Sequence, residues 1–130
     1  AGPNFGTGSS REHAPWALED YGFEAIISPR FADIFRNNCL KIGLVPVELP
    51  PEVVDRIMAA LEDDPSLEIV VDVRDRRVAV PALDLDEPFH LDAFHHHRLV
   101  HGLDDIALTL QHEPEITAYE ATRSAWLPST

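Results

Sequence analysis

The sequence predicts an α/β domain with a mixed, mostly parallel sheet flanked by helices, followed by a helical C-terminal tail. In the first half of the chain, helical segments alternate with short apolar segments, an order that favours right-handed crossovers and a parallel sheet. In the middle, apolar residues alternate on both sides of Arg74-Asp75-Arg76, which is typical of a β-hairpin with one buried face. The length of 130 residues, 45% of them hydrophobic, suits one domain spanning residues 1–130.

The elements expected in the first half are, in order, a loop (1–8), a helix to about Tyr21, a strand (24–28), a helix to about Ile42 and a strand (44–49). Gly22 suits a left-handed helix stop. For the second helix, Ser28 is the expected cap and Pro29 the expected first residue. Pro46 places the second strand at a sheet edge, because proline cannot donate a ladder hydrogen bond.

The elements expected in the second half are a helix from Pro50-Pro51 to about Leu61, a hairpin from Leu67 to Val80, a short strand at 89–91 and a helical tail at 92–126. The tail should consist of three helical pieces, broken near Gly102 and at Glu113-Pro114. Asp104 or Asp105 is the natural cap of the second piece.

Composition excludes several classes of function. The formal net charge is −13, from 23 acidic and 10 basic residues, so the surface repels phosphate backbones and nucleic-acid binding is not expected. No apolar run approaches the length of a membrane span. The single cysteine, Cys39, excludes an intrachain disulfide and favours a reducing compartment, the cytoplasm. One thiol also cannot hold an iron–sulfur cluster, which needs about four ligands.

The run from Asn4 to Ala14 (NFGTGSSREHA) carries the chemistry. Gly6 and Gly8 allow a tight turn and a close approach by a ligand. Ser9 and Ser10 come where a helix begins, and the free N–H groups of a helix start attract anions. Arg11 adds a guanidinium that can grip a carboxylate through two hydrogen bonds. These residues predict a site for an oxyanion or a carboxylate.

A structural alternative uses the same residues. Ser9 to Glu12 also fits a capping box, with Ser9 as the cap and Glu12 reaching back. Pro15 would then lie in the second turn, so the helix either kinks there or begins near Glu12, which would free both serines. A dinucleotide fingerprint would need glycine where Arg11 stands, and the P-loop and hydrolase-elbow patterns are absent.

The run GSSREHA resembles the signature of the swivelling domain of the aconitase superfamily. The wider stretches NFGTGSSREHAPWAL and SPRFADIFRNNCLKIGLVPV resemble the small subunit of isopropylmalate dehydratases, and the segment from Gly102 to Glu120 is similar to the C-terminal tail of the bacterial leucine-pathway enzymes. The resemblance covers nearly the whole chain. It implies an aconitase-type swivelling domain.

The resemblance implies a hydro-lyase subunit, inactive alone, that isomerises 2-isopropylmalate to 3-isopropylmalate via 2-isopropylmaleate in leucine biosynthesis. Ser9 would be the catalytic base, Ser10 and Arg11 would bind the small dicarboxylate substrate, and Gly6, Gly8, Glu12 and His13 would support the loop. The expected partner is a large subunit that holds a [4Fe–4S] cluster; no cofactor is expected in this chain.

The resemblance also places a strand and a substrate-sensing loop upstream of Ala1. We therefore expect the 130 residues to be a domain lacking its N-terminal portion. A missing strand would leave unpaired backbone groups and exposed apolar faces, with self-association as the expected consequence. Because that loop would sense the substrate, a related hydro-lyase acting on methylmalate or homoaconitate stays an alternative. A non-catalytic anion-binding assembly module is a second alternative, which the intact Ser9-Ser10-Arg11 run disfavours.

Other conspicuous residues favour structural interpretations. His95-His96-His97 and His101 invite a metal site, but consecutive histidines point in different directions around a helix, so we expect a solvated face and no metal. Cys39 should pack as a small apolar residue. Trp16 and Trp126 suit core or interface packing.

Overall fold

The computed structural model describes residues 1–8 and 11–122, and the strands in these residues form two sheets. The elements are α1 (His13–Tyr21), β1 (Ala25–Ser28), α2 (Asp33–Ile42), β2 (Val45–Glu48), α3 (Pro51–Asp63), β3 (Val70–Asp72), β4 (Arg77–Val80), a 3₁₀ turn η1 (Pro81–Leu83), β5 (Leu85–Pro88), α4 (Ala93–His101), α5 (Asp105–Leu110) and α6 (Glu113–Thr122). The predicted α/β class is confirmed. The grouping of the strands differs from the single, mostly parallel sheet that the sequence suggested.

The first sheet contains β1 and β2, which run parallel from the pair Ala25–Val45 to the pair Ser28–Glu48. Both flanking helices end as predicted. Gly22 closes α1 and Gly43 closes α2, each in the left-handed conformation that glycine adopts without a steric penalty.

The predicted start of the second helix is wrong. Ser28 is the last residue of β1, and α2 begins only at Asp33. The chain stays extended to Phe31 because Phe31 forms a parallel bridge with Phe5. The Ser28 hydroxyl oxygen instead lies within hydrogen-bond distance of two carbonyl oxygens, those of Gly2, at 2.8 Å, and Arg30, at 2.9 Å.

The second sheet has the antiparallel order β3-β4-β5 and confirms the predicted hairpin, with Val71 opposite Val78. The strand expected at residues 89–91 is wrong: the third strand is β5, which begins at Leu85. Asp84, with φ of 48°, turns the chain after η1, so the strand starts beside Val80. Phe89 and Leu91 are buried in the core beyond its end.

Two hydrophobic clusters lie on opposite faces of β1, where successive side chains alternate. Ala25 and Ile27 pack against the larger sheet cluster, whereas Ile26 belongs to the smaller aromatic cluster. The sheet cluster comprises Leu40, Val45, Val47, Leu49, Val53, Val54, Ile57, Val78, Val80, Leu85, Phe89 and Leu91. The aromatic cluster comprises Ile26, Phe31, Phe35, Cys39 and Leu44, with Phe5 packed against it.

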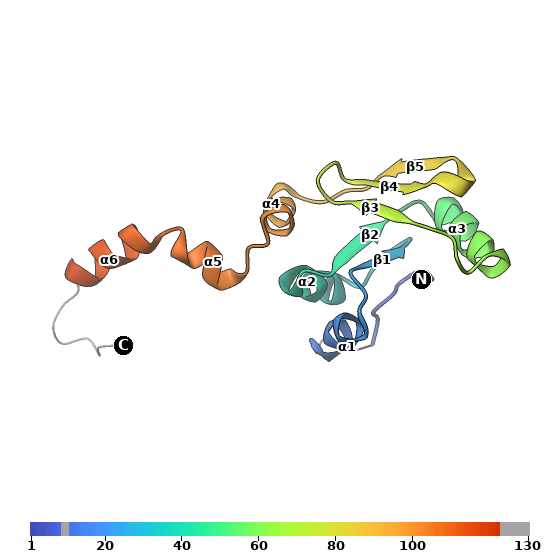
Figure 1. Cartoon of the computed structure of the whole chain (residues 1–130). Helices are drawn as coiled ribbons and strands as arrows, with labels where there is room; N and C mark the ends of the chain where they lie inside the picture. The colour runs from blue at the N-terminus through green and yellow to red at the C-terminus, as the bar shows by residue number, and fades with distance from the viewer. Residues whose placement is uncertain (9–10, 123–130) are drawn as a thin grey trace.

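The C-terminal segment forms three helices, as predicted, and α5 and α6 extend away from the sheets (Figure 1). Gly102 ends α4, and the Asp104 carboxylate caps α5 by accepting from the Ala107 N–H at 2.6 Å. The second break lies just before Glu113, so Pro114 stands in the first turn of α6, where a missing N–H costs no helical hydrogen bond. Among the described residues, none of the helices is long and apolar enough to cross a membrane.

Candidate functional site

The loop that leads to the serine motif is attached to the body of the protein at Phe5. The Phe5 N–H donates to the Arg30 carbonyl at 3.1 Å, and the Ala32 N–H donates to the Phe5 carbonyl at 3.0 Å. The ring of Phe5 packs edge-on against Phe31 and Phe35, at centroid distances of 6.4 and 5.5 Å. Phe5 is therefore fixed through both its backbone and its side chain.

Gly6 is required at its position for two reasons. Its φ of 81° lies in the left-handed region, and a Cβ atom there would overlap the ring of Phe35. Gly8 also has a positive φ, 131°, but open space surrounds the place of its missing Cβ. The two glycines predicted to support the loop thus act differently: Gly6 through close packing and Gly8 through backbone conformation alone.

Ser9 and Ser10, the predicted base and substrate-binding serine, lie outside the described residues, as does Trp126. The described part resumes at Arg11, which is exposed, and α1 begins at His13 with Glu12 in the N-cap position. The Glu12 side chain makes no capping hydrogen bond. The capping-box alternative is therefore wrong: the helix starts after the motif, and Pro15 falls in its first turn.

Glu12 and His13 contact other parts of the molecule. One Glu12 carboxylate oxygen accepts from the Lys41 ammonium of α2 at 3.4 Å, and both side chains are about half exposed. The His13 ring packs edge-on against Trp16, at a centroid distance of 5.1 Å. The loop-supporting role that the sequence suggested for these two residues stays a prediction.

The single cysteine is unsuited to chemistry at this site. Cys39 is fully buried in the aromatic cluster, as expected of a small packed residue. Burial raises the pKa of its thiol to about 12, so the thiolate that binds metals or attacks substrates does not form at neutral pH.

The histidines of α4 have partners from within the chain. His95 Nδ1 lies 2.6 Å from the Asp92 carboxylate, and His96 Nε2 lies 3.0 Å from the carbonyl of Arg74. His101 Nδ1 lies 2.9 Å from the His97 carbonyl. Across residues 1–8 and 11–122, no group of three or more histidine, cysteine or acidic side chains is arranged to hold a metal ion.

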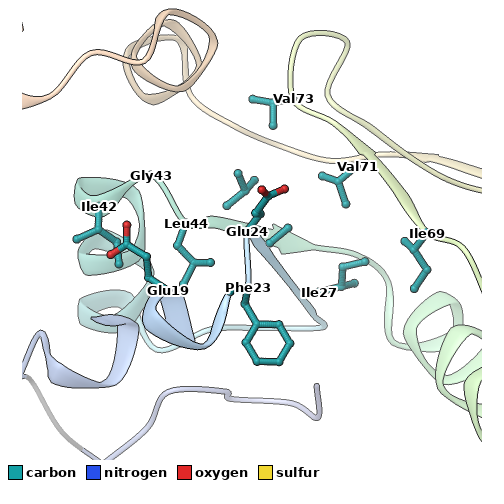
Figure 2. Close-up of a pocket in the computed structure, with 13 residues that line it drawn as sticks. Glu19, Phe23, Glu24, Ile27, Ile42, Gly43, Leu44, Ile69, Val71 and Val73 are labelled. Carbon is teal, nitrogen blue, oxygen red and sulfur yellow. The ribbon is translucent and has the colours of Figure 1, made fainter. Parts of the chain in front are cut away.

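We call the segment 4–13, which carries the serine motif, the candidate loop. A large groove lies elsewhere in the molecule. It has a volume of about 770 Å³ and is lined mainly by apolar residues between β1 and β3. Figure 2 shows Ile69, Val71 and Val73 on one wall and Phe23 and Ile27 on the other. Its polar walls carry carboxylates, Glu19 and Glu24, which repel a carboxylate substrate. Of the described residues in the candidate loop, 4–8 and 11–13, none lines the groove.

Comparisons with known proteins agree with the resemblance drawn from the motifs. Residues 1–52 match the family described as aconitase C-terminal domain, and residues 105–128 match the family described as the C-terminal domain of the 3-isopropylmalate dehydratase small subunit. Proteins named 3-isopropylmalate dehydratase small subunit are 62% identical in Frankia alni, over 99% of this chain and 65% of the relative, and 55% identical in Thermobifida fusca, over 100% and 66%. The chain thus spans just under two thirds of the length of these relatives.

A crystal structure of 3-isopropylmalate dehydratase from Methanocaldococcus jannaschii superposes with a TM-score of 0.64 at 24% identity, covering 92% of this chain and 66% of that one. The shared fold and the family match of residues 1–52 define an aconitase-type domain. Within that class, the chain is similar to the small subunits of 3-isopropylmalate dehydratases.

Sequence reasoning missed two residues at the site, Phe35 and Lys41. The sequence predicted a helix that includes Phe35 but not the contact of its ring with Gly6. Lys41 is the only lysine of the chain, which could have marked it as a partner for an acidic residue. Its pairing with Glu12 spans 29 positions, so no local pattern identifies it.

Proposed function

We propose that this chain serves as the small subunit of a 3-isopropylmalate dehydratase and takes part in isomerising 2-isopropylmalate to 3-isopropylmalate in leucine biosynthesis. The proposal rests on the Ser9-Ser10-Arg11 run in a chain that is 62% identical to a protein of that name. In the sequence, this run stands between the attached residues Phe5 and Gly6 on one side and Glu12, the N-cap residue of α1, on the other. Because α1 starts at His13 with Glu12 in the N-cap position, Ser9 is not the N-cap of this helix.

Each residue of the run has a role in the proposed reaction. The Ser9 alkoxide takes a proton from the carbon next to one carboxylate and becomes a hydroxyl, while the substrate's hydroxyl group leaves the neighbouring carbon, which gives 2-isopropylmaleate. Water then adds with its hydroxyl on the other carbon and its proton where the hydroxyl had been. Ser10 and Arg11 bind carboxylate oxygens, and Arg11 stabilises the negative charge that develops when the proton is removed.

The proposed reaction also needs a partner. The described residues offer no metal-binding group, and the one cysteine is buried, so a [4Fe–4S] cluster does not fit this chain. We place the cluster on a large subunit, where it would supply a Lewis acid for the departing hydroxyl. The substrate site would then form between the two subunits, and we expect this heterodimer in the cytoplasm.

The test uses the natural protein carrying this sequence, reconstituted with its large subunit. Ser9→Ala should lower kcat by about 10²- to 10⁴-fold with little change in KM, because a base acts in the transition state. Ser66→Ala is the matched control, since Ser66 hydrogen-bonds to Asp64 in the exposed turn after α3. A kcat within a few-fold of wild type in Ser9→Ala would refute the assignment.

Arg11→Lys tests the binding role separately. One ammonium group cannot replace the two parallel hydrogen bonds of a guanidinium, so KM should rise by about tenfold or more. Arg56→Lys is the control, because Arg56 contacts only the Leu83 carbonyl among the hydrogen bonds of the described residues. Equal KM values in the two variants would contradict the role of Arg11.

A further inference from the structure

The helix α2 contacts the candidate loop at both of its ends. Phe35 packs against Gly6 before the serine motif, and Lys41 pairs with Glu12 directly after it. Between these two contacts lie the three residues to which the proposed function assigns chemistry. One helix therefore determines where the loop starts and where it returns.

The contact at the start of the loop leaves no free space. Phe35 is 3% exposed, and its ring occupies the volume that a Cβ atom on Gly6 would need. The same ring packs edge-on against Phe5, whose backbone is hydrogen-bonded to Arg30 and Ala32. A smaller side chain at position 35 would open a gap under Gly6, and close-packed interiors transmit such changes to their neighbours.

The contact at the end of the loop is electrostatic. Lys41 and Glu12 are 54% and 45% exposed, so solvent screens the pair and its contribution to folding stability is small. The position of the pair matters for the loop, because Glu12 directly follows Arg11 and is the N-cap residue of α1. Lys41 thus ties the start of α1 to the last turn of α2.

The two contacts lie on one helix at a fixed spacing. Phe35 and Lys41 are six residues apart on α2, which corresponds to about 9 Å along the helix axis. A helix keeps this spacing constant, whereas two separate loops would let it vary. The segment from Gly6 to Glu12 is consequently anchored on a rigid frame at both ends.

We propose that Phe35 and Lys41 are positioning residues for the reaction: they hold the described residues on either side of the two serines, Gly6 before them and Glu12 after them. The inference rests on the proposed function and adds to it two residues that touch no substrate. A displacement of about 1 Å at a reacting group can cost about a hundredfold in rate, so modest contacts can matter here.

The Lys41 contact is tested by a double-mutant cycle in the reconstituted enzyme. Lys41→Met should lower kcat by about tenfold with KM changed less than about twofold. Glu12→Gln should lower kcat by the same factor as Lys41→Met. The double variant should lower kcat no further than either single variant, because both substitutions remove the same interaction. Lys41→Arg, which keeps the charge, should recover at least about half of the wild-type kcat.

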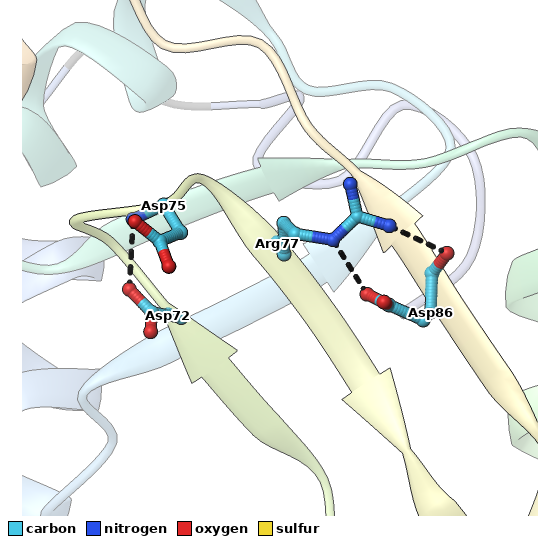
Figure 3. Close-up of polar contacts among 4 residues, drawn as sticks. All are labelled: Asp72, Asp75, Arg77 and Asp86. Atoms are coloured by element: carbon cyan, nitrogen blue, oxygen red, sulfur yellow. Dashed lines mark hydrogen bonds and ion pairs between the residues drawn. The ribbon is translucent and has the colours of Figure 1, made fainter.

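The matched control is a second exposed ion pair. Arg77 donates from Nε to Asp86 at 2.7 Å across β4 and β5, in the sheet that lies apart from α1 (Figures 1 and 3). Arg77→Met removes a comparable surface pair and should leave kcat unchanged. If Lys41→Met and Arg77→Met give equal kcat values, or if the costs of the single variants add in the double variant, the proposal for Lys41 is overturned.

The Phe35 contact needs a control for lost stability. Phe35→Leu should lower kcat by about ten- to a hundredfold. Leu40→Ala is the control, because Leu40 is 2% exposed on the same helix but belongs to the sheet cluster. Both variants should unfold at lower denaturant concentration, and only Phe35→Leu should lose kcat when assayed where both are folded. Equal losses of kcat in Phe35→Leu and Leu40→Ala would show that Phe35 has only a structural role.

Amide hydrogen exchange separates this inference from the proposed function. If the wild-type complex does not convert isopropylmalate, the proposed function fails, and the positioning contacts can still be measured. Lys41→Met should then speed amide exchange at Arg11 and Glu12 by several-fold. Phe35→Leu should speed amide exchange at Phe5 and Gly6. Arg77→Met is the reference, in which exchange at these four residues should not change. Unaltered exchange in both variants would overturn the inference on its own.

Discussion

The aromatic cluster and the sheet cluster lie on opposite faces of β1, and they differ in what depends on them. The sheet cluster joins β2, α3, β4, β5 and α2, and none of its members belongs to the candidate loop. The aromatic cluster has fewer members, yet Phe35 within it contacts Gly6 and Phe5 packs on it. Apolar burial on one face thus involves the fold alone, whereas on the other face it also involves contacts with the candidate loop.

Gly6 offers the strongest test of this difference between the aromatic cluster and the sheet cluster. Gly6→Ala places a β-carbon against the Phe35 ring at a φ of 81°, so backbone strain and overpacking add. We expect a loss of about 2–5 kcal/mol in the free energy of unfolding and a fall in kcat of about a hundredfold. Denaturant unfolding and the reconstituted enzyme assay measure the two effects.

Gly8→Ala is the matched comparison for this prediction. Gly8 has a φ of 131° but no heavy atom near the place of a Cβ, so the variant bears backbone strain alone. Its loss of stability should be smaller, about 1–3 kcal/mol. Equal losses of stability in the two variants would mean that the overlap with Phe35 adds nothing to the destabilisation by Gly6→Ala.

The sheet cluster should respond in stability without a change in catalysis. Leu91 is 0% exposed, and Leu91→Ala should lower the free energy of unfolding by about 2–5 kcal/mol through lost burial and the cavity left behind. The kcat of the folded complex should stay within about twofold of wild type. A large fall in kcat at unchanged secondary structure would show that this cluster also shapes the site.

A smaller effect concerns the pH dependence of stability through Cys39 in the aromatic cluster. Its pKa is about 12 in the folded chain, against an ordinary value of 9.0. Above pH 9.0 the unfolded chain therefore loses this proton first, and the stability that the protonated buried thiol provides declines as pH rises toward 12. The difference in unfolding free energy between wild type and Cys39→Ala should be constant below about pH 9 and shrink above it.

Urea titrations of the two proteins at pH 7, 8 and 10 measure this difference. Taking the difference cancels the titration of tyrosine and lysine, which both proteins share. A difference that is independent of pH from 7 to 10 would show that the buried thiol does not titrate as its surroundings dictate.

Elements with a local signal could be predicted from the sequence, whereas those set by distant contacts could not. The hairpin around Asp75, the glycine stops and the Asp104 cap follow from alternation and capping preferences within a few residues. The start of α2 was misplaced because the Phe5–Phe31 bridge, 26 residues apart, keeps Ser28 to Phe31 extended. β5 was misplaced because LDEP has no apolar alternation, and its register comes from β4.

The same distinction applies to the candidate site. The types of residue in the serine-arginine run indicated an anion site and, by resemblance, a family, because those residues are adjacent in sequence. The contacts that hold the loop come from α2, across 29 positions in the case of Glu12 and Lys41. Only the folded arrangement brings Phe35 and Lys41 to the two ends of the loop.

The central claim is that the loop held by α2 supplies Ser9 to a substrate site completed by a large subunit. The most direct measurement is the ultraviolet absorbance of isopropylmaleate formed from isopropylmalate by the natural protein carrying this sequence, by its large subunit, and by the two together, each with wild-type chain and with Ser9→Ala. The account predicts product only from the wild-type mixture. Product from this protein alone, or equal rates from the wild-type and Ser9→Ala mixtures, would contradict it.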